Sequence, residues 1–164
     1  LIFAADRSYM AEGEFEEYNN KEATIILSNS NFGSFLMSND MSRIDTRFIG
    51  SPEQILLAKQ NLDKQILAEE ANNLGLITFM FDDIDWDDEI RMFLEERSSF
   101  SPDSMVGMES NLRFPGKETM ETKIFGRLSA WQNWIFQRPS AVGENGALKK
   151  YGTGNKGQYT KERT

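Results

Sequence analysis

The stretch from residue 118 to residue 152, ETMETKIFGRLSAWQNWIFQRPSAVGENGALKKYG, decides the fold expected for the second half of the chain. Pro139 cannot continue a helix, so the segment predicts a helix over residues 119–137 that ends just before it. We expect its apolar face to be core or interface, because burial of large apolar side chains is favourable. Four residues at i, i+4, i+7 and i+11 form that face: Ile124, Leu128, Trp131 and Ile135.

Capping and turn signals divide the rest of the chain into short elements. Ser51 followed by Pro52 predicts a helix start, and Gly75 predicts a helix end in the left-handed conformation. The β-branched run at residues 23–27 is typical of a buried parallel strand. Helices are expected over residues 52–60, 68–74, 86–97 and 102–113, and strands at residues 23–27 and 76–80.

An acidic run at residues 82–89 has the alternating spacing of a calcium loop but lacks two of its required residues. Asp88 stands where the loop needs glycine, and Leu94 stands where it needs a bidentate glutamate. We therefore predict that Asp85 caps a helix and that the acids complement the helix dipole. The expected buried side is Trp86, Ile90, Phe93 and Leu94, and in the next helix Met105, Met108 and Leu112.

Composition excludes several kinds of chemistry. The 164 residues include neither cysteine nor histidine, so disulfides, thiol nucleophiles and imidazole bases are absent from this chain. No apolar run is long enough to span a bilayer, which makes the cytoplasm the expected location. Residues 1–90 carry a net charge of −12 and residues 91–164 carry +4, so the second half is the candidate for binding phosphates. The overall acidity, −8, argues against a nucleic-acid partner.

The order of residues 118–152 resembles the C-terminal segment of benzoyl-CoA-dihydrodiol lyases, members of the enoyl-CoA hydratase (crotonase) superfamily. Residues 66–77, ILAEEANNLGLI, resemble a superfamily helix that ends at glycine, and residues 1–6, LIFAAD, resemble the end of the helix after the oxyanion-hole glycines. The resemblance implies that the chain is a truncated C-terminal part. It implies an α/β fold: a degenerate crotonase-like half-module over residues 1–81, a helical region over 82–138 and a basic, Gly-rich tail over 139–164.

The same resemblance implies that this part of the protein has lost its catalytic acid. Residues 27–50 keep the length of the segment that usually carries a catalytic glutamate in a Leu-Pro-Glu-Val sequence. Aligned on it, Ser28 takes the position of the proline and Asn29 that of the glutamate, and an asparagine exchanges no proton at neutral pH. We therefore expect no catalytic residue in this chain and no acyl-CoA turnover by the chain alone.

For the intact protein, the resemblance implies hydrolytic C–C cleavage of an epoxidised or dihydroxylated benzoyl-CoA ring in aerobic benzoate breakdown, with release of formate. It implies no metal and no cofactor other than the coenzyme A of the substrate. The expected partners are an N-terminal crotonase-like half and a second copy in a homodimer. Candidate coenzyme A contacts are Arg127, Trp131, Arg138, Lys149 and Lys150, since cations suit phosphates and indole stacks on adenine, although core packing also explains Trp131.

Two other functions remain open. A generic enoyl-CoA hydratase or isomerase fits the less specific part of the resemblance, but Asn29 argues against it. A non-catalytic scaffold or oligomerisation module fits the missing catalytic groups. A Gly-rich turn directly before residue 1 would favour an enzyme site, and a degenerate one would favour the scaffold.

Overall fold

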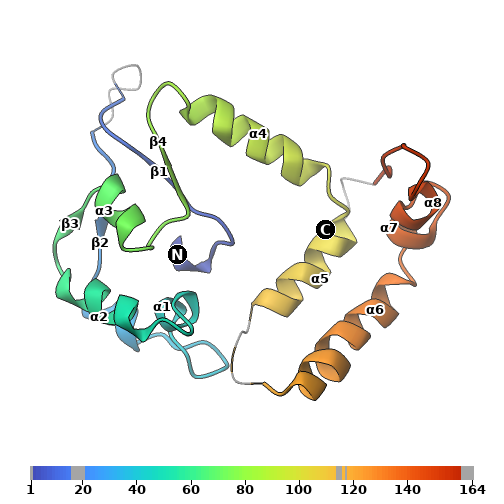
Figure 1. The fold of residues 1–164 in the computed structure, drawn as a ribbon, viewed down its shortest axis with the longest axis horizontal. Helices are drawn as coiled ribbons and strands as arrows, with labels where there is room; N and C mark the ends of the chain where they lie inside the picture. Colours follow the sequence, from blue (N-terminus) through green and yellow to red (C-terminus); the bar gives the residue numbers. More distant parts are fainter. Residues whose placement is uncertain (1, 16–20, 114–115, 117, 160–164) are drawn as a thin grey trace. The chain divides into compact units, whose positions relative to one another are not determined.

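The computed structural model describes residues 2–15, 21–113, 116 and 118–159, and it divides the chain into two compact units (Figure 1). The first unit covers Leu1–Leu94 and the second covers Glu95–Thr164. The division between the two units falls inside a helix. The domain boundary between residues 81 and 82, expected from the sequence, stays a prediction. Within the described ranges, no helix has both the length and the apolar composition needed to cross a membrane.

The first unit combines two small sheets with short helices around one core. The parallel pair β1–β4 and the antiparallel pair β2–β3 form separate two-stranded sheets. Leu27, Ile44, Ile66 and Leu76 are the largest fully buried side chains of the core. The elements are η1 (Ile2–Ala4), β1 (Tyr9–Ala11), β2 (Ile25–Ile26), η3 (Asn29–Phe32), α1 (Arg43–Arg47), α2 (Pro52–Gln60), β3 (Gln65–Ile66), α3 (Ala68–Asn73), β4 (Phe79–Phe81) and α4 (Trp86–Ser98), which continues into the second unit.

The strands differ from the sequence predictions in pairing and extent. Residues 23–27 were expected to form a buried parallel strand, but β2 pairs antiparallel with β3 and leaves Ile26 57% exposed. The strand expected at residues 76–80 begins later, at Phe79, because Leu76 and Ile77 pack into the core before the chain reaches β1. Short-range sequence signals cannot specify which strand becomes the neighbour, and that neighbour determines pairing direction.

The predicted helices of this unit are confirmed in position, with corrections to their caps and faces. Gly75 ends α3 with φ +69°, as its position predicted. At the start of α4, the side chain that accepts backbone hydrogen bonds is that of Asp82, from the N–H groups of Ile84 and Asp85, so the prediction of Asp85 as the cap was wrong in this respect. Leu94, expected on the buried side, is 59% exposed.

An aromatic cluster joins the parallel sheet to α4. Tyr9 stacks on Phe79 with ring centroids 5.3 Å apart and meets Phe93 of α4 at 5.2 Å. The guanidinium carbon of Arg7 lies 5.2 Å from the Phe93 ring centroid. These contacts orient α4, although its residues include none that is fully buried.

The second unit is helical and contains α5 (Pro102–Leu112), a π-helix η4 (Thr122–Leu128), α6 (Ser129–Ile135), α7 (Pro139–Val142) and α8 (Ala147–Lys150). The inward face of α5 was predicted to carry Met105, Met108 and Leu112. Met108 and Leu112 are exposed, and the buried residues are instead Asp103 and Gly107. A helix that buries a carboxylate and a glycine gives no hydrophobic signal on its inner face, so periodicity indicated the wrong side.

The helix predicted over residues 119–137 forms, but part of it is π-helical. The Ser129 N–H donates to the Ile124 carbonyl, five residues back, instead of four. The wider turns change which side chains point inward. Of the four residues predicted to form the buried face, Ile135 is buried and Trp131 is half-buried, whereas Ile124 and Leu128 are 38% and 52% exposed.

Candidate functional site

Asn29, which the resemblance aligns with a catalytic glutamate, opens the short 3₁₀-helix η3 and is exposed. Ser28 begins this turn, and its backbone N–H donates to Asn31 Oδ1 at 2.8 Å. The local turn is therefore built by neutral side chains, and Asn29 itself supplies no titrating group. In the described ranges, no cluster of three or more His, Cys, Asp or Glu side chains is arranged to hold a metal ion.

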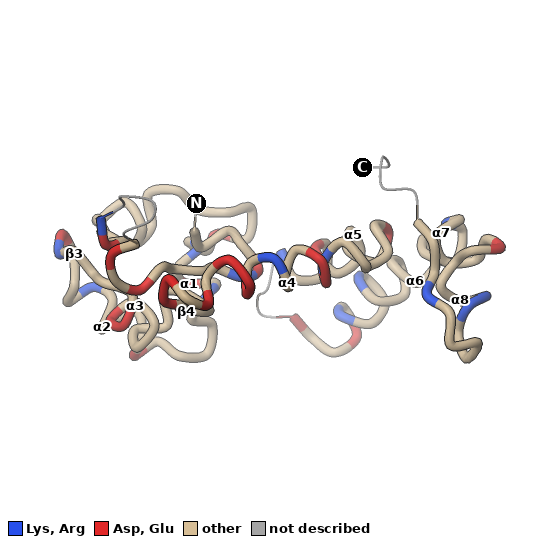
Figure 2. The backbone as a smooth tube through the Cα atoms, turned by 90° about the horizontal axis from the view of Figure 1, so that it is seen from above, with Lys and Arg blue, Asp and Glu red and all other residues tan. Residues whose placement is uncertain are grey.

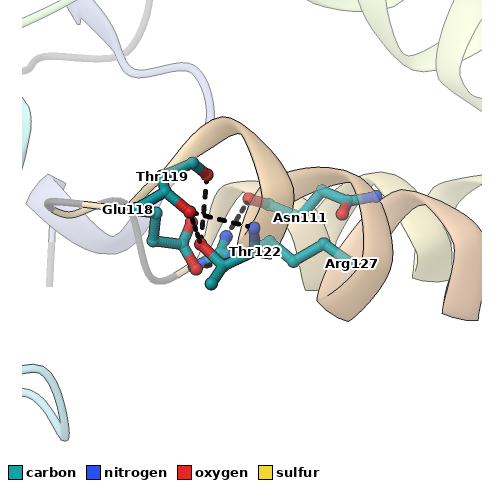
Figure 3. Close-up of polar contacts among 5 residues, drawn as sticks. All are labelled: Asn111, Glu118, Thr119, Thr122 and Arg127. Carbon is teal, nitrogen blue, oxygen red and sulfur yellow. Dashed lines mark hydrogen bonds and ion pairs between the residues drawn. The ribbon is translucent and has the colours of Figure 1, made fainter.

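Arg127 is held between the ends of two helical segments in the second unit (Figure 3). Its Nε lies 3.0 Å from Glu118 Oε1, and its Nη1 donates to the carbonyl oxygen of Asn111 at 2.7 Å. The side chains of Arg127 and Glu118 are only 23% and 25% exposed. We call Asn111, Glu118 and Arg127 the arginine clamp. It joins the C-terminal end of α5 to the start of the next helix.

The start of that helix is fixed by Thr119, which lies beside the arginine clamp. Its hydroxyl oxygen accepts from the Thr122 N–H at 3.2 Å, and its carbonyl accepts from the Thr122 hydroxyl at 3.0 Å (Figure 3). A hydrogen bond from its own backbone and one from Thr119 lower the pKa of Glu121, so this first-turn carboxylate is charged and complements the helix dipole. Thr119 therefore acts as an N-cap that positions Glu118 for Arg127.

Arg138 lies at the turn between α6 and α7 and binds a buried carboxylate. Its Nε is 3.1 Å from Asp103 Oδ1, with Asp103 4% exposed and Arg138 32% exposed. The Ser140 hydroxyl donates to the other oxygen of Asp103 and lies 3.1 Å from the Ser101 hydroxyl. The guanidinium also stacks over the Trp134 ring, at 5.2 Å from its centroid. This network fixes the start of α5 to the α6–α7 turn.

Trp131 packs against α5 at the place where that helix has its glycine. A Cβ atom added to Gly107 would lie 1.2 Å from Trp131 Nε1, so the indole occupies the space that any side chain would need. The indole N–H is buried and finds no acceptor in the described part of the chain. This contact favours the structural interpretation of Trp131.

Trp131 also borders an open apolar pocket of about 420 Å³. Its volume lies within the range usual for small-molecule sites. Nine residues from α5, η4, α6, the C-cap of α6, α7 and α8 line it: Ser104, Leu128, Trp131, Gln132, Ile135, Phe136, Ala141, Ala147 and Leu148. Trp131 thus contributes both to the packing of α5 and to the wall of this pocket.

Lys149 and Lys150 end α8, directly after the two α8 residues that line the apolar pocket. Lys149 is exposed and Lys150 is half-buried. Figure 2 shows basic residues, coloured blue, at α8. Gly143 and Gly146 precede them in a tight turn in which an added Cβ would meet the Pro139 and Ala141 carbonyls at 2.6 Å. The turn that leads into α8 therefore needs both glycines.

The structure thus gives the five predicted contacts different surroundings. Arg127 and Arg138 are bound to carboxylates of the chain itself, whereas the lysines follow two α8 residues that line the pocket and do not line it themselves. The acidic partners Glu118 and Asp103 were not predicted from the sequence. Asp103 follows Ser101-Pro102 at a helix start, where an acid is expected for the dipole alone, and nothing local shows that Arg138 meets it.

The comparison with known proteins agrees with the resemblance seen in the sequence. No family model matches the chain. Over 159 residues, 97% of the chain, it is 50% identical to a benzoyl-CoA-dihydrodiol lyase from Aromatoleum evansii. The chain is homologous to this lyase. The predicted resemblance to benzoyl-CoA-dihydrodiol lyases is therefore confirmed.

The chain spans only 28% of the length of that lyase. The homology to the lyase covers both units described above, since the aligned residues make up almost the whole chain. The mixture of helices with small sheets agrees with the predicted α/β class, whereas a crotonase-like arrangement remains an expectation.

Proposed function

We propose that this chain is part of an enzyme that cleaves the ring of an oxygenated benzoyl-CoA. The homologue is named as a lyase of benzoyl-CoA-dihydrodiol, which supports the substrate class and the lyase class of this proposal. The observation that supports this proposal is the 50% identity over nearly the whole chain. The reaction proposed for the complete protein is hydrolytic C–C cleavage of an epoxidised or dihydroxylated ring with release of formate, in aromatic compound breakdown. Such a reaction is redox-neutral, so it needs no electron carrier.

Within that enzyme we assign this chain to support and to substrate binding, and we assign catalysis to the remainder of the protein. Asn29 replaces the expected acid and lies exposed on a 3₁₀ turn. The proposed partners are an N-terminal crotonase-like half of the same protein and a second copy in a homodimer. This chain tested alone is expected to give only background rates with crotonyl-CoA and with an epoxidised benzoyl-CoA.

For coenzyme A, we propose contacts at the apolar pocket and the lysines beside it. An ammonium group on a flexible stem suits a phosphate, and the pocket wall formed by Trp131 and Phe136 suits the apolar part of a CoA ester. Arg127 and Arg138 remain candidates, but a phosphate would have to share them with Glu118 and Asp103. We therefore expect phosphate contacts at Lys149 and Lys150 more than at the two arginines.

A non-catalytic scaffold is the alternative function that one observation favours, namely the exposed Asn29 on its 3₁₀ turn. A generic enoyl-CoA hydratase or isomerase is less well supported, because that chemistry usually needs an acid at this position. Turnover of crotonyl-CoA by the complete protein, lost on Asn29→Ala, would support the hydratase and would contradict our assignment of Asn29.

Replacement of both lysines is expected to weaken binding of the CoA ester without unfolding the protein. In the complete protein, Lys149→Ala with Lys150→Ala should raise the dissociation constant for a benzoyl-CoA analogue roughly tenfold, since each phosphate contact is a charge-assisted hydrogen bond. The melting temperature should stay within about 2 °C, since solvent-facing substitutions change stability little. Calorimetric titration and thermal melts measure both quantities.

The matched control for the lysines is Lys123→Ala, because Lys123 is an exposed cation in η4 away from the pocket. Unchanged affinity in the double lysine variant, together with normal affinity in the control, would remove α8 from the coenzyme A site. The segment would then be a packing element only.

A further inference from the structure

The sequence and the structure disagree about the helix that carries Arg127. Ile124 and Trp131 are seven residues apart, close to two α-helical turns, so a regular α-helix would place both on one face. In the structure, Ile124 lies inside the π-helical segment η4, whose wide turn ends before Trp131, and Ile124 is exposed while Trp131 packs on Gly107. The apolar spacing therefore favours a register different from the one observed.

Arg127 is more buried than its neighbour Leu128, although the sequence pattern predicts Leu128 on the buried face. The Arg127 side chain is 23% exposed and bonded on two sides within the arginine clamp, whereas Leu128 is 52% exposed. The wide turn allows this, because a π-helix contains one more residue between hydrogen-bonded groups than an α-helix. The polar bonds of one side chain thus accompany a register in which Ile124 and Leu128 are 38% and 52% exposed.

We propose that this helix is a two-register switch, held in the π register by the arginine clamp and released when an anion replaces Glu118 as the partner of Arg127. In the α register, the residues up to Ile124 would rotate against those from Ser129 onward by about 100°, the angle of one residue. Ile124 would then turn toward the face of Trp131, and burial of Ile124 would offset the lost contacts of the clamp.

The anion that fits this exchange is a phosphate, because a guanidinium binds carboxylate and phosphate with the same donor geometry. This ligand-dependent part rests on the proposed function, in which the protein binds coenzyme A. The existence of two registers does not rest on it, since it follows from the arginine clamp and the apolar spacing. Binding of the phosphate would then be coupled to the register of the helix that lines the apolar pocket.

The chain contains no cysteine, so a single introduced thiol reports the register directly. In the complete protein, Ile124→Cys places a thiol that is exposed in the observed register and covered in the α register. Alkylation of that peptide, followed by mass spectrometry, should slow roughly tenfold when Glu118→Gln is added, because that change weakens a charge-assisted bond of the clamp. The matched controls are Phe125→Cys, exposed in both registers, and Glu109→Gln, which breaks an ion pair with Arg113 outside the clamp.

Ligand control is tested on the same thiol with three probes: coenzyme A, 3′-dephospho-coenzyme A and inorganic phosphate. Coenzyme A should slow alkylation at Ile124→Cys, and a response to inorganic phosphate as well would assign the effect to phosphate alone. Deletion of Gly126, which removes the extra residue of the wide turn, should abolish the response because it keeps Ile124 off the face of Trp131. The Glu118→Gln protein should also bind coenzyme A several-fold more tightly, because less free energy is needed to separate Arg127 from residue 118.

Equal alkylation of Ile124→Cys with and without Glu118→Gln would overturn the switch. If Glu118→Gln slows the reaction but bound coenzyme A does not, phosphate control is wrong. If calorimetry finds no binding of coenzyme A at all, the proposed function fails, while the comparison of Glu118 variants without ligand still decides whether two registers exist.

Discussion

Gly107→Ala is expected to destabilise the second unit by about 3 kcal/mol or more, because the added methyl group would lie 1.2 Å from Trp131 Nε1. The added methyl group would force the indole away from α5, and an overpacked core costs about 1–3 kcal/mol even when side chains can adjust. Trp131→Ala should lower the free energy of unfolding by about 3–5 kcal/mol for a different reason, because it removes a large packed side chain. Chemical denaturation of the complete protein, followed through the transition of this region, measures both effects.

The double variant Gly107→Ala with Trp131→Ala should be more stable than the sum of the single effects indicates, because the new methyl group then enters the space left by the indole. Gly126→Ala is the matched control, since nothing lies within 4 Å of a Cβ at Gly126. A Gly107→Ala protein as stable as wild type would show that Trp131 does not pack on α5 as described.

Arg138→Ala is expected to destabilise by about 3 kcal/mol, because it leaves the buried carboxylate of Asp103 without its cation. The sequence alone presents Arg138 as a surface cation whose removal would change ligand binding only. The structure predicts a loss of stability as well, together with loss of the stacking on Trp134. Thermal melts beside titrations with a benzoyl-CoA analogue separate the two effects.

Arg138→Ala combined with Asp103→Asn should recover part of that stability, since the double variant no longer buries the negative charge that Arg138 binds. Arg113→Ala is the control, because its ion pair with Glu109 is exposed on both sides and contributes little. A melting temperature unchanged by Arg138→Ala would contradict the buried pair with Asp103.

The sequence by itself determined the position of most helices and the resemblance of the chain to benzoyl-CoA-dihydrodiol lyases. Pro52, Gly75, Pro102 and Pro139 act through local backbone restrictions, so the element boundaries near them were predictable. The residue order of the C-terminal segment also sufficed for the resemblance that the 50% identity confirms. The lack of cysteine and histidine, a property of composition alone, limits the chemistry open to this chain.

Only the tertiary structure decided which sides of those helices are buried and which partners the arginines have. Arg127 meets Glu118 nine residues away, and Arg138 meets Asp103 thirty-five residues away, so no local pattern contains either pair. Gly107 gives no hydrophobic signal, yet the indole of Trp131 packs on it because a residue without Cβ permits that approach. The π-helical turn likewise depends on contacts to α5, and it rotates the buried face that periodicity had assigned to Ile124 and Leu128.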